Sequence, residues 1–311
     1  MRDFRNIIFV LIVLLFILQM VVSSKDEEML PSKPIVAVST FALYDITQHI
    51  AGDSVEIVNL LPFGVDAHSF EPTPKLMAAL EKSSLVIYSG AGLEPWTKGF
   101  HFHSKVINMS KNVKLRELKS NEYDLHGHHD EQCAHNSIDP HYWLDLKNMK
   151  IATELITEEL IRISPLQEAL YKKNRDKYIK MLIDLDQDYQ DSLYSCRHDT
   201  IITNHNAFSY LAARYSFHVE ALSGLSPDTQ PSAKEIKRIM QHIKEENVSV
   251  IFFESFVSDR VMKSIARDLG VRVDVLQPLG NITADEAHKH LTYEYIMRDN
   301  LVKLHKALEC R

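Results

Sequence analysis

Residues 34–61 read PIVAVSTFALYDITQHIAGDSVEIVNLL, and this stretch decides the fold. Its first part, 34–39, encloses a continuously apolar and β-branched run, as in the buried strands of parallel sheets. A helix over 41–51 should follow and end near Gly52, and residues 55–61 alternate as a second strand. A strand, a helix and a strand at these intervals form a βαβ unit. The stretch therefore predicts a mainly parallel sheet with helices on both faces.

The same alternation extends along the rest of the chain. A helix over 75–82, a strand over 85–88 and a helix over 146–163 that ends before Pro165 continue the first half. A second half repeats the pattern, and its predicted strands and helices are 200–203, 207–215, 217–221, 233–246, 248–253, 258–269 and 271–276. The sequence thus predicts an α/β protein with two (βα)n lobes, an N-terminal lobe over 30–165 and a C-terminal lobe over 196–311.

A long helix is predicted between the two lobes, over residues 166–195. This stretch holds no Gly or Pro after Pro165, and its apolar side chains recur at steps of three and four from Tyr178 to Leu193, which marks one face of a helix. About 30 residues at 1.5 Å each reach roughly 45 Å, more than the diameter of a small domain. We therefore expect a rigid linking helix. A coiled-coil dimer would need a longer heptad pattern, so a monomer is expected.

The first 24 residues have the pattern of a secretory signal peptide. Arg2 and Arg5 precede an apolar run over 7–22, and charged residues follow Ser23 and Ser24. An uncleaved membrane anchor is the alternative, although the run is slightly shorter than the ~20 residues that span a bilayer. Export predicts a periplasmic protein if the source is a Gram-negative bacterium.

The cysteines fit an exported protein in one of two ways. Cys196 and Cys310 can close a disulfide within the second half, which would leave Cys133 free. Three reduced thiols are the alternative, because pairing cannot be read from a sequence.

The composition limits the classes of partner. The chain has 311 residues, of which 45% are apolar and 25% are charged, as in a globular protein. The net charge of −7 and the absence of a long Lys/Arg run exclude an extended phosphate-binding surface, so no nucleic-acid partner is expected.

Three histidines stand in similar contexts, His68, His141 and His205. Each follows a predicted strand in a turn rich in Asp, Asn, Pro or Gly. Open α/β sheets bind ligands at the carboxyl ends of their strands, so imidazoles delivered there can converge on one ion. Three imidazoles around Zn²⁺ leave a fourth position for water or another ligand. The pattern predicts a metal site that uses these three residues.

A histidine-rich loop precedes His141. Residues 121–135 lack an apolar period and contain Asp124, His126, His128, His129, Asp130, Glu131, Cys133 and His135. Imidazole, carboxylate and thiolate groups at this density bind zinc or copper loosely, and a solvated polar loop is the alternative. We expect the loop to gather zinc, or to sense zinc sufficiency, without setting the main affinity.

The segments that carry the three histidines resemble those of a known family. PFGVDAHSFEPTP (62–74), DPHYWLD (139–145) and NHNAFSY (204–210) are similar to the metal-binding segments of the zinc and manganese solute-binding proteins of ABC transporters. The resemblance covers nearly all of residues 34–311. It implies two (βα)n lobes joined by one long helix, a metal in the cleft between them, and delivery of the ion to a membrane permease driven by an ATPase.

Within that family, a histidine at the third position marks the zinc branch, and His205 fits it. A manganese- or iron-binding member is the alternative. The resemblance also leaves the fourth ligand open, because the aspartate position of manganese binders holds Leu291 here, and leucine cannot coordinate a metal. The candidates are water first, then a loop histidine such as His128 or His129, then His288 or His290. Glu254 follows a predicted buried strand, where it would orient a ligand, bind directly or cap the next helix.

Two other functional classes fit part of the pattern. Zinc held by three histidines with a water is also a hydrolytic arrangement, but the chain has no His-Glu-x-x-His helix, so an enzyme is not expected. A surface adhesin or scaffold is the other class, and it would tolerate loss of the histidines.

Overall fold

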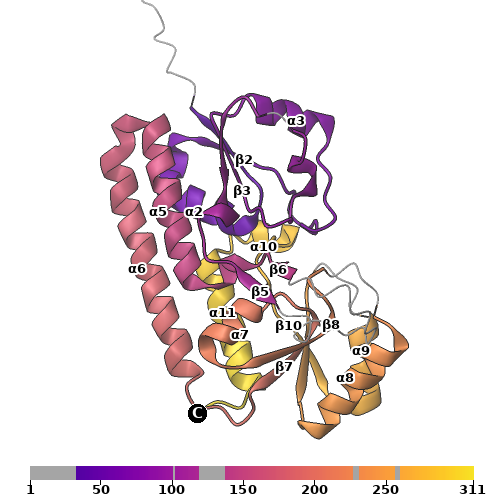
Figure 1. Ribbon diagram of the computed structural model, residues 1–311. Helices are drawn as coiled ribbons and strands as arrows, with labels where there is room; N and C mark the ends of the chain where they lie inside the picture. Colours follow the sequence, from indigo (N-terminus) through magenta and orange to yellow (C-terminus); the bar gives the residue numbers. More distant parts are fainter. Residues whose placement is uncertain (1–32, 101, 119–136, 227–230, 256–259) are drawn as a thin grey trace, which may run out of the picture. The chain divides into compact units, whose positions relative to one another are not determined.

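The computed structural model describes most of the chain beyond the predicted signal peptide (Figure 1). The described residues are 33–100, 102–118, 137–226, 231–255 and 260–311. The predicted signal peptide (1–24) and the histidine-rich loop (121–135), with His128 and His129, therefore lie outside them. Among the helices of the described part, none combines the length and the apolar character needed to span a membrane.

The first sheet is wholly parallel, as the opening stretch predicts. Its strands lie in the order β2-β1-β3-β4, with Val36 of β1 paired to Ile57 on one side and Leu85 on the other. The strands are β1 (Ile35–Val38), β2 (Glu56–Asn59), β3 (Leu85–Tyr88) and β4 (Lys105–Asn108). The helices of this half are α2 (Phe41–Ala51) and α3 (Pro74–Glu81). The sequence alone predicted no strand at β4.

The second sheet is also parallel, with the order β10-β9-β7-β8. Its strands are β7 (Thr200–His205), β8 (His218–Ser223), β9 (Val250–Phe253) and β10 (Arg272–Val275). Its helices are α7 (Ser209–Tyr215), α8 (Ala233–Glu245) and α9 (Arg260–Leu269). At the start of α8, Ser232 and Glu235 form a reciprocal capping box, which satisfies two donors of the first turn.

Side chains on alternate positions of each sheet enter different cores. Val36 and Val38 face one cluster, which also contains Ile201 and Phe252 of the second sheet. Ala37 faces a smaller cluster under α3, and Ile251 faces one under α8 and α9. Because successive strand residues point to opposite faces, this is the pattern of sheets covered on both sides. One apolar core thus continues through both lobes.

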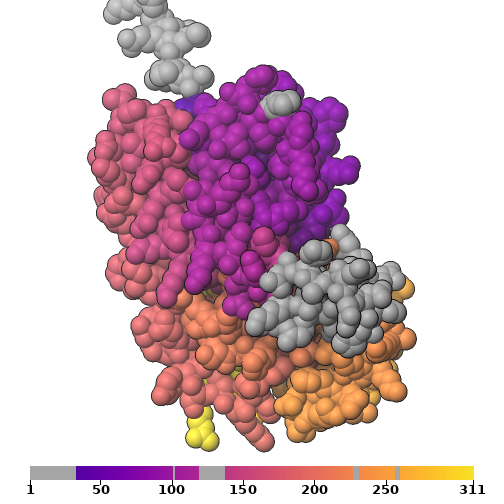
Figure 2. Space-filling model, viewed as in Figure 1, coloured from indigo at the N-terminus to yellow at the C-terminus, as the bar shows by residue number. Residues whose placement is uncertain are grey.

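A long helix connects the two lobes. It is α6 (Glu168–Ser192), which follows α5 (Leu146–Ile163) and packs against α5, α2 and α11. Its buried face carries Tyr171, Tyr178, Leu182, Leu185 and Tyr189, which include the periodic residues of the sequence. In the space-filling view, its pink surface runs beside both the purple first half and the orange second half (Figure 2). Its 25 residues span about 37 Å.

A short antiparallel pair, β5 (Arg116–Leu118) and β6 (Ser137–Asp139), leads to the His141 turn. A strand was expected before His141, but the sequence predicted bounds for neither β5 nor β6, since three residues show no clear period. The remaining short elements are the 3-10 helices Gly52–Ser54, Pro95–Thr97, Met109–Lys111, Tyr142–Leu144 and Pro165–Gln167.

The end of the chain returns to the first lobe. Residues 278–283 follow β10, and the Phe41 N–H donates to the carbonyl oxygen of Gly280 at 3.0 Å. The Asn281 side-chain amide donates to the carbonyl oxygens of Pro62 and Val65. The last helices are α10 (Ala284–His288) and α11 (Tyr293–Ala307). The segment therefore touches the lobe to which it was not assigned.

A disulfide joins Cys196 to Cys310, as the first of the two sequence interpretations expected. The bridge joins Cys196, four residues before β7, to the end of the chain beyond α11. Cys133 lies outside the described residues.

Candidate metal centre

His68 lies in the long turn after β2. The carboxylate of Asp66 accepts a hydrogen bond from the His68 backbone N–H at 2.8 Å, which fixes the turn locally. The turn is also fastened from the C-terminal half, because Gly64 N–H donates to the Ile282 carbonyl at 2.8 Å. His68 is half-buried, and its ring faces the two other histidines.

His141 is held by a carboxylate two residues before it. Asp139 Oδ1 accepts from the backbone N–H of His141 at 2.9 Å and contacts the ring Nδ1 at 2.7 Å. Both side chains are buried, with 0% of Asp139 exposed. A carboxylate on Nδ1 fixes the proton there and leaves Nε2 as the free lone pair.

His205 has an equivalent partner just beyond the end of the neighbouring strand. It is the last residue of β7, and its Nδ1 forms an ion pair with Glu254, which directly follows β9. Both side chains are 2% exposed. Three roles were expected for Glu254, and this contact fits the one in which it orients a histidine ring.

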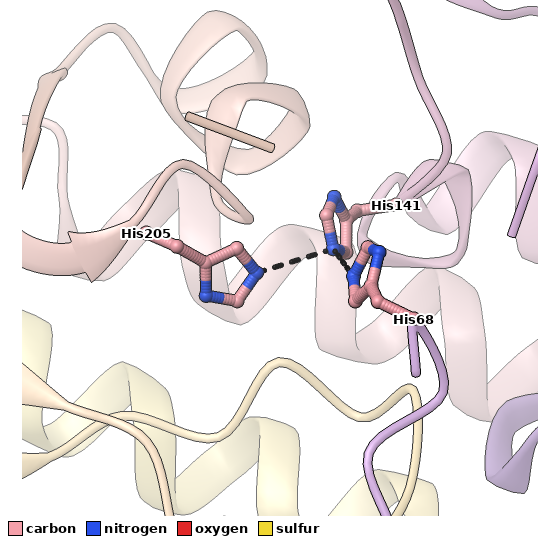
Figure 3. Close-up of side chains that lie close together, drawn as sticks. All are labelled: His68, His141 and His205. Carbon is pink, nitrogen blue, oxygen red and sulfur yellow. Dashed lines mark hydrogen bonds between the residues drawn. The ribbon is translucent and has the colours of Figure 1, made fainter. Parts of the chain in front are cut away.

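The three rings direct their Nε2 atoms to one point (Figure 3). His141 Nε2 lies 3.3 Å from His68 Nε2 and 3.4 Å from His205 Nε2. In a tetrahedral zinc site with Zn–N bonds near 2.05 Å, neighbouring ligand nitrogens are about 3.3–3.4 Å apart. Within the part of the chain that the structure describes, these histidines are the one group of three or more potential ligands close enough to share an ion.

The electrostatics of the site keep a lone pair available on His68 and act differently on His205. Burial, together with the neighbouring His141 and His205, lowers the pKa of His68 to about 2, so this ring is neutral. At His205, burial acts to lower the pKa, but the Glu254 charge and hydrogen bond, with Asp66 and Asp139, leave the pKa raised. Buried carboxylates around imidazoles create a negative potential that suits a cation.

The cavity beside the rings is small. It measures about 20 Å³, which accommodates one water-sized group. Besides the three histidines it is lined by Asp66, Ala67, Leu93, Trp143, Glu254, Pro278, Gly280 and Asn281. A side chain at residue 280 would crowd the indole, since an added Cβ would lie 3.2 Å from Trp143 Cζ2. The site therefore has room for a small fourth ligand.

The remaining candidates for a fourth ligand lie elsewhere. His288 and His290 are exposed and do not line the cavity. Leu291 packs against the apolar core.

Sequence reasoning missed the supporting role of Asp66 and Asp139. The signal was available, because both stand two residues before a histidine, in Asp-Ala-His and Asp-Pro-His. An Asp at this spacing commonly closes a turn by accepting from a backbone N–H two residues on.

Comparisons with known proteins agree with the predicted fold and the predicted family. The family described as "Zinc-uptake complex component A periplasmic" matches residues 36–307. The "High-affinity zinc uptake system protein ZnuA" of Bacillus subtilis is 31% identical over 278 residues, which cover 88% of this chain and 87% of that protein. The zinc-binding lipoprotein AdcA of Streptococcus pneumoniae is 27% identical, and the match spans 57% of its length.

Solved structures give the same result. The Zn(II)-bound ZnuA-like domain of S. pneumoniae AdcA aligns with a TM-score of 0.74 and 26% identity over 89% of this chain and all of the domain. The laminin-binding protein Lmb of Streptococcus agalactiae, described as having adhesin and metal-transporting activity, aligns with a TM-score of 0.77 and 28% identity over 89% of this chain and 100% of its own. These matches confirm the predicted two-lobed α/β fold and the predicted family resemblance. The chain belongs to the zinc-uptake complex component A family, a family of uptake proteins and not of enzymes.

Proposed function

We propose that this protein captures Zn²⁺ in the periplasm through His68, His141 and His205 and delivers it to the permease of an ABC importer. The observation that carries the proposal is the convergence of three Nε2 atoms at the separation of tetrahedral zinc ligands. The ion is cargo that must be bound and later released.

The donor set favours zinc over manganese or iron. Imidazole nitrogens suit zinc, whereas manganese prefers carboxylate and other oxygen ligands. The carboxylates at the site are already engaged. Asp139 and Glu254 each contact the Nδ1 of a histidine, and Asp66 accepts from the His68 backbone N–H. We expect a water as the fourth ligand, because the cavity has the volume of one such group.

The position of the ligands provides a route to release. His68 follows β2 of the first sheet, His141 follows β6 of the short antiparallel pair, and His205 ends β7 of the second sheet. Separation of the two lobes would remove one of three ligands and weaken the site sharply. Binding would thus favour a closed arrangement, and contact with a permease would favour an open one.

Metal analysis of untagged protein tests the proposal. We expect one zinc per chain in competition titrations, and at least a hundredfold weaker binding for His68→Ala, His141→Ala and His205→Ala. His218→Ala is the matched control, because His218 is exposed at the start of β8. If the three variants retained zinc as tightly as this control, the proposed site would be wrong.

Uptake is tested separately in cells. Deletion of the gene should stop growth in chelated medium, and added zinc or the wild-type gene should restore it. The His141→Ala gene should fail to do so. An adhesin would show no such zinc-dependent growth, and a hydrolase would show zinc-dependent turnover of esters or peptides. Fractionation of the cells would check the expected removal of residues 1–24 and export.

A further inference from the structure

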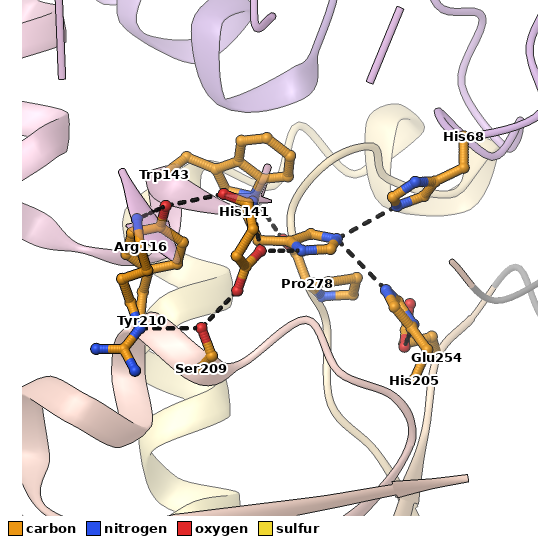
Figure 4. Close-up of polar contacts among 10 residues, drawn as sticks. His68, Arg116, His141, Trp143, His205, Ser209, Tyr210, Glu254 and Pro278 are labelled. Atoms are coloured by element: carbon orange, nitrogen blue, oxygen red, sulfur yellow. Dashed lines mark hydrogen bonds and ion pairs between the residues drawn. The ribbon is translucent and has the colours of Figure 1, made fainter. Parts of the chain in front are cut away.

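The carboxylate that orients His141 is itself held from the opposite lobe (Figure 4). Asp139 Oδ1 faces His141, and Asp139 Oδ2 accepts a hydrogen bond from the hydroxyl of Ser209. Ser209 is the first residue of α7, four positions after His205. One ligand of the metal centre is therefore supported by a residue that follows another ligand on the second sheet.

The direction of this hydrogen bond is fixed by a third group. Arg116 Nε donates to Ser209 Oγ at 3.2 Å, so the single hydroxyl proton is left for Asp139. Ser209 is buried, with 7% of its surface exposed. A hydroxyl held between a guanidinium and a carboxylate has one favourable orientation, and it makes a charge-assisted bond.

The backbone at Asp139 is fixed from the same helix. Tyr210 donates its hydroxyl proton to the Asp139 carbonyl oxygen at 2.8 Å and accepts from Arg116 N–H at 2.9 Å. Asp139 therefore has partners on both oxygens and on its main chain, and α7 provides two of them. Asp139 cannot turn without breaking contacts between the lobes.

From this chain of contacts we infer that Ser209 is a positioning residue for metal binding, which acts through Asp139 on the direction of His141 Nε2. Closure of the lobes places the Ser209 hydroxyl on Asp139 and so completes His141 as a ligand. Opening removes this support together with His205. The inference rests on the proposed zinc site and adds a coupling between lobe contact and ligand geometry.

The test measures zinc dissociation from full-length Ser209→Ala by stopped-flow competition with a chelator. A residue bound directly to a ligand histidine is worth 10–100-fold in metal affinity. Ser209 acts one step further away, so we expect roughly threefold to tenfold faster dissociation with a smaller change in association. Ser209→Thr retains the hydroxyl and should restore the wild-type rate. Ser54→Ala is the matched control, since Ser54 shares a 2.6 Å hydrogen bond with Tyr171 away from the metal site.

Double variants separate positioning from a general loss of structure. In Asp139→Asn and in His141→Ala backgrounds, Ser209→Ala should add no further change, because the path through Asp139 is already broken. Dissociation from Ser209→Ala at the wild-type rate, or an equal effect in the His141→Ala background, would overturn the inference while leaving the zinc site intact. A wild-type protein that binds no zinc would overturn both proposals.

Discussion

At the scale of single residues, a carboxylate contacts the Nδ1 of each buried histidine of the candidate site, on the side of the ring away from Nε2. Glu254 supports His205 as Asp139 supports His141, although Glu254 lies 49 positions along the chain and Asp139 only two. The negative charge of Glu254 favours an Nδ1–H proton on His205. It thereby increases the electron density that Nε2 can offer to a cation.

Glu254→Gln should therefore weaken zinc binding by roughly tenfold, because the amide keeps the shape of the side chain and loses the charge. A chelator competition titration at constant pH measures the change. Glu81→Gln, at the exposed end of α3, provides the control and should bind as the wild type does. Equal affinities for the two variants would show that the ion pair does not tune the ligand.

The sequence indicated the three candidate histidines more clearly than the residues that contact them. His68, His141 and His205 stand out because strand ends and turn residues are local signals. Ser209 carries no such signal, since its contact with Asp139 joins positions 70 residues apart. Such a pairing depends on how two sheets meet, and one sequence does not contain that information.

At the scale of helices, one buried carboxylate joins three of them. Asp45 in α2 accepts from the Tyr178 hydroxyl of α6 at 2.7 Å and from the Tyr293 N–H of α11 at 3.1 Å. Tyr293 is the first residue of α11, where backbone N–H groups lack helical partners and the helix dipole favours an anion. Burial and the Asp45 charge raise the pKa of Tyr178, so its phenol remains a donor.

Asp45→Ala should lower the free energy of unfolding by about 3 kcal/mol, since it leaves two buried donors without acceptors at roughly 1–3 kcal/mol each. Urea denaturation of the metal-free protein measures this loss. Asp176→Ala on the exposed face of α6 is the control and should change stability by less than about 0.5 kcal/mol. A loss below about 1 kcal/mol for Asp45→Ala would show that water replaces the carboxylate.

The same carboxylate makes stability depend on pH through His49. The hydrogen bond with Asp45, opposed by burial and helped by the Asp45 charge, raises the His49 pKa from 6.5 to about 9. A histidine whose pKa is higher in the folded state adds stability that is complete below pH 6.5 and is lost as the pH rises through 9. Glu294 also acts to raise this pKa.

Wild-type protein should therefore exceed His49→Gln in unfolding free energy at pH 6, and the difference should shrink steadily towards pH 9.5. Urea denaturation of both proteins at several pH values gives the difference directly. A gap that stayed constant over this range would mean that the ring contributes only by packing.

The helix bounds were predicted closely where a Gly or Pro follows the helix. The predicted bounds 41–51 and 146–163 match α2 and α5, because Gly52 and Pro165 mark their ends. The strands β4, β5 and β6 were not assigned. They are three or four residues long, and their pairing partners, not their own period, make them strands.

At the scale of the whole described fold, the two lobes share one apolar core, and one segment of the second lobe packs on the first. The return of residues 278–283 to the first lobe was not predicted, because its contacts are made by irregular backbone with no apolar period. The long helix and this return segment connect the lobes on separate paths. We therefore expect opening of the site to be small, with the lobes moving about a continuous core.

The disulfide fixes the end of the C-terminal segment that follows residues 278–283. It joins positions 114 residues apart, and backbone hydrogen bonds from Arg197 N–H and His198 N–H to the Leu308 carbonyl reinforce it. A cross-link that closes a loop of this length restricts the unfolded chain and typically adds about 2–4 kcal/mol to the free energy of unfolding. Replacement of both bridged cysteines by serine should lower the free energy of unfolding by that amount.

Zinc affinity is expected to change little in the same variant, because neither bridged cysteine lines the metal cavity. Denaturant unfolding and chelator competition on the same preparation separate the two effects, with Cys133→Ser as the control for thiol removal. If affinity fell at a temperature where the variant remains folded, strain at the end of α11 would be reaching the site through residues 278–283. Zinc affinity would then depend on the C-terminal segment from residue 278 to the disulfide as well as on the three imidazoles and their carboxylates.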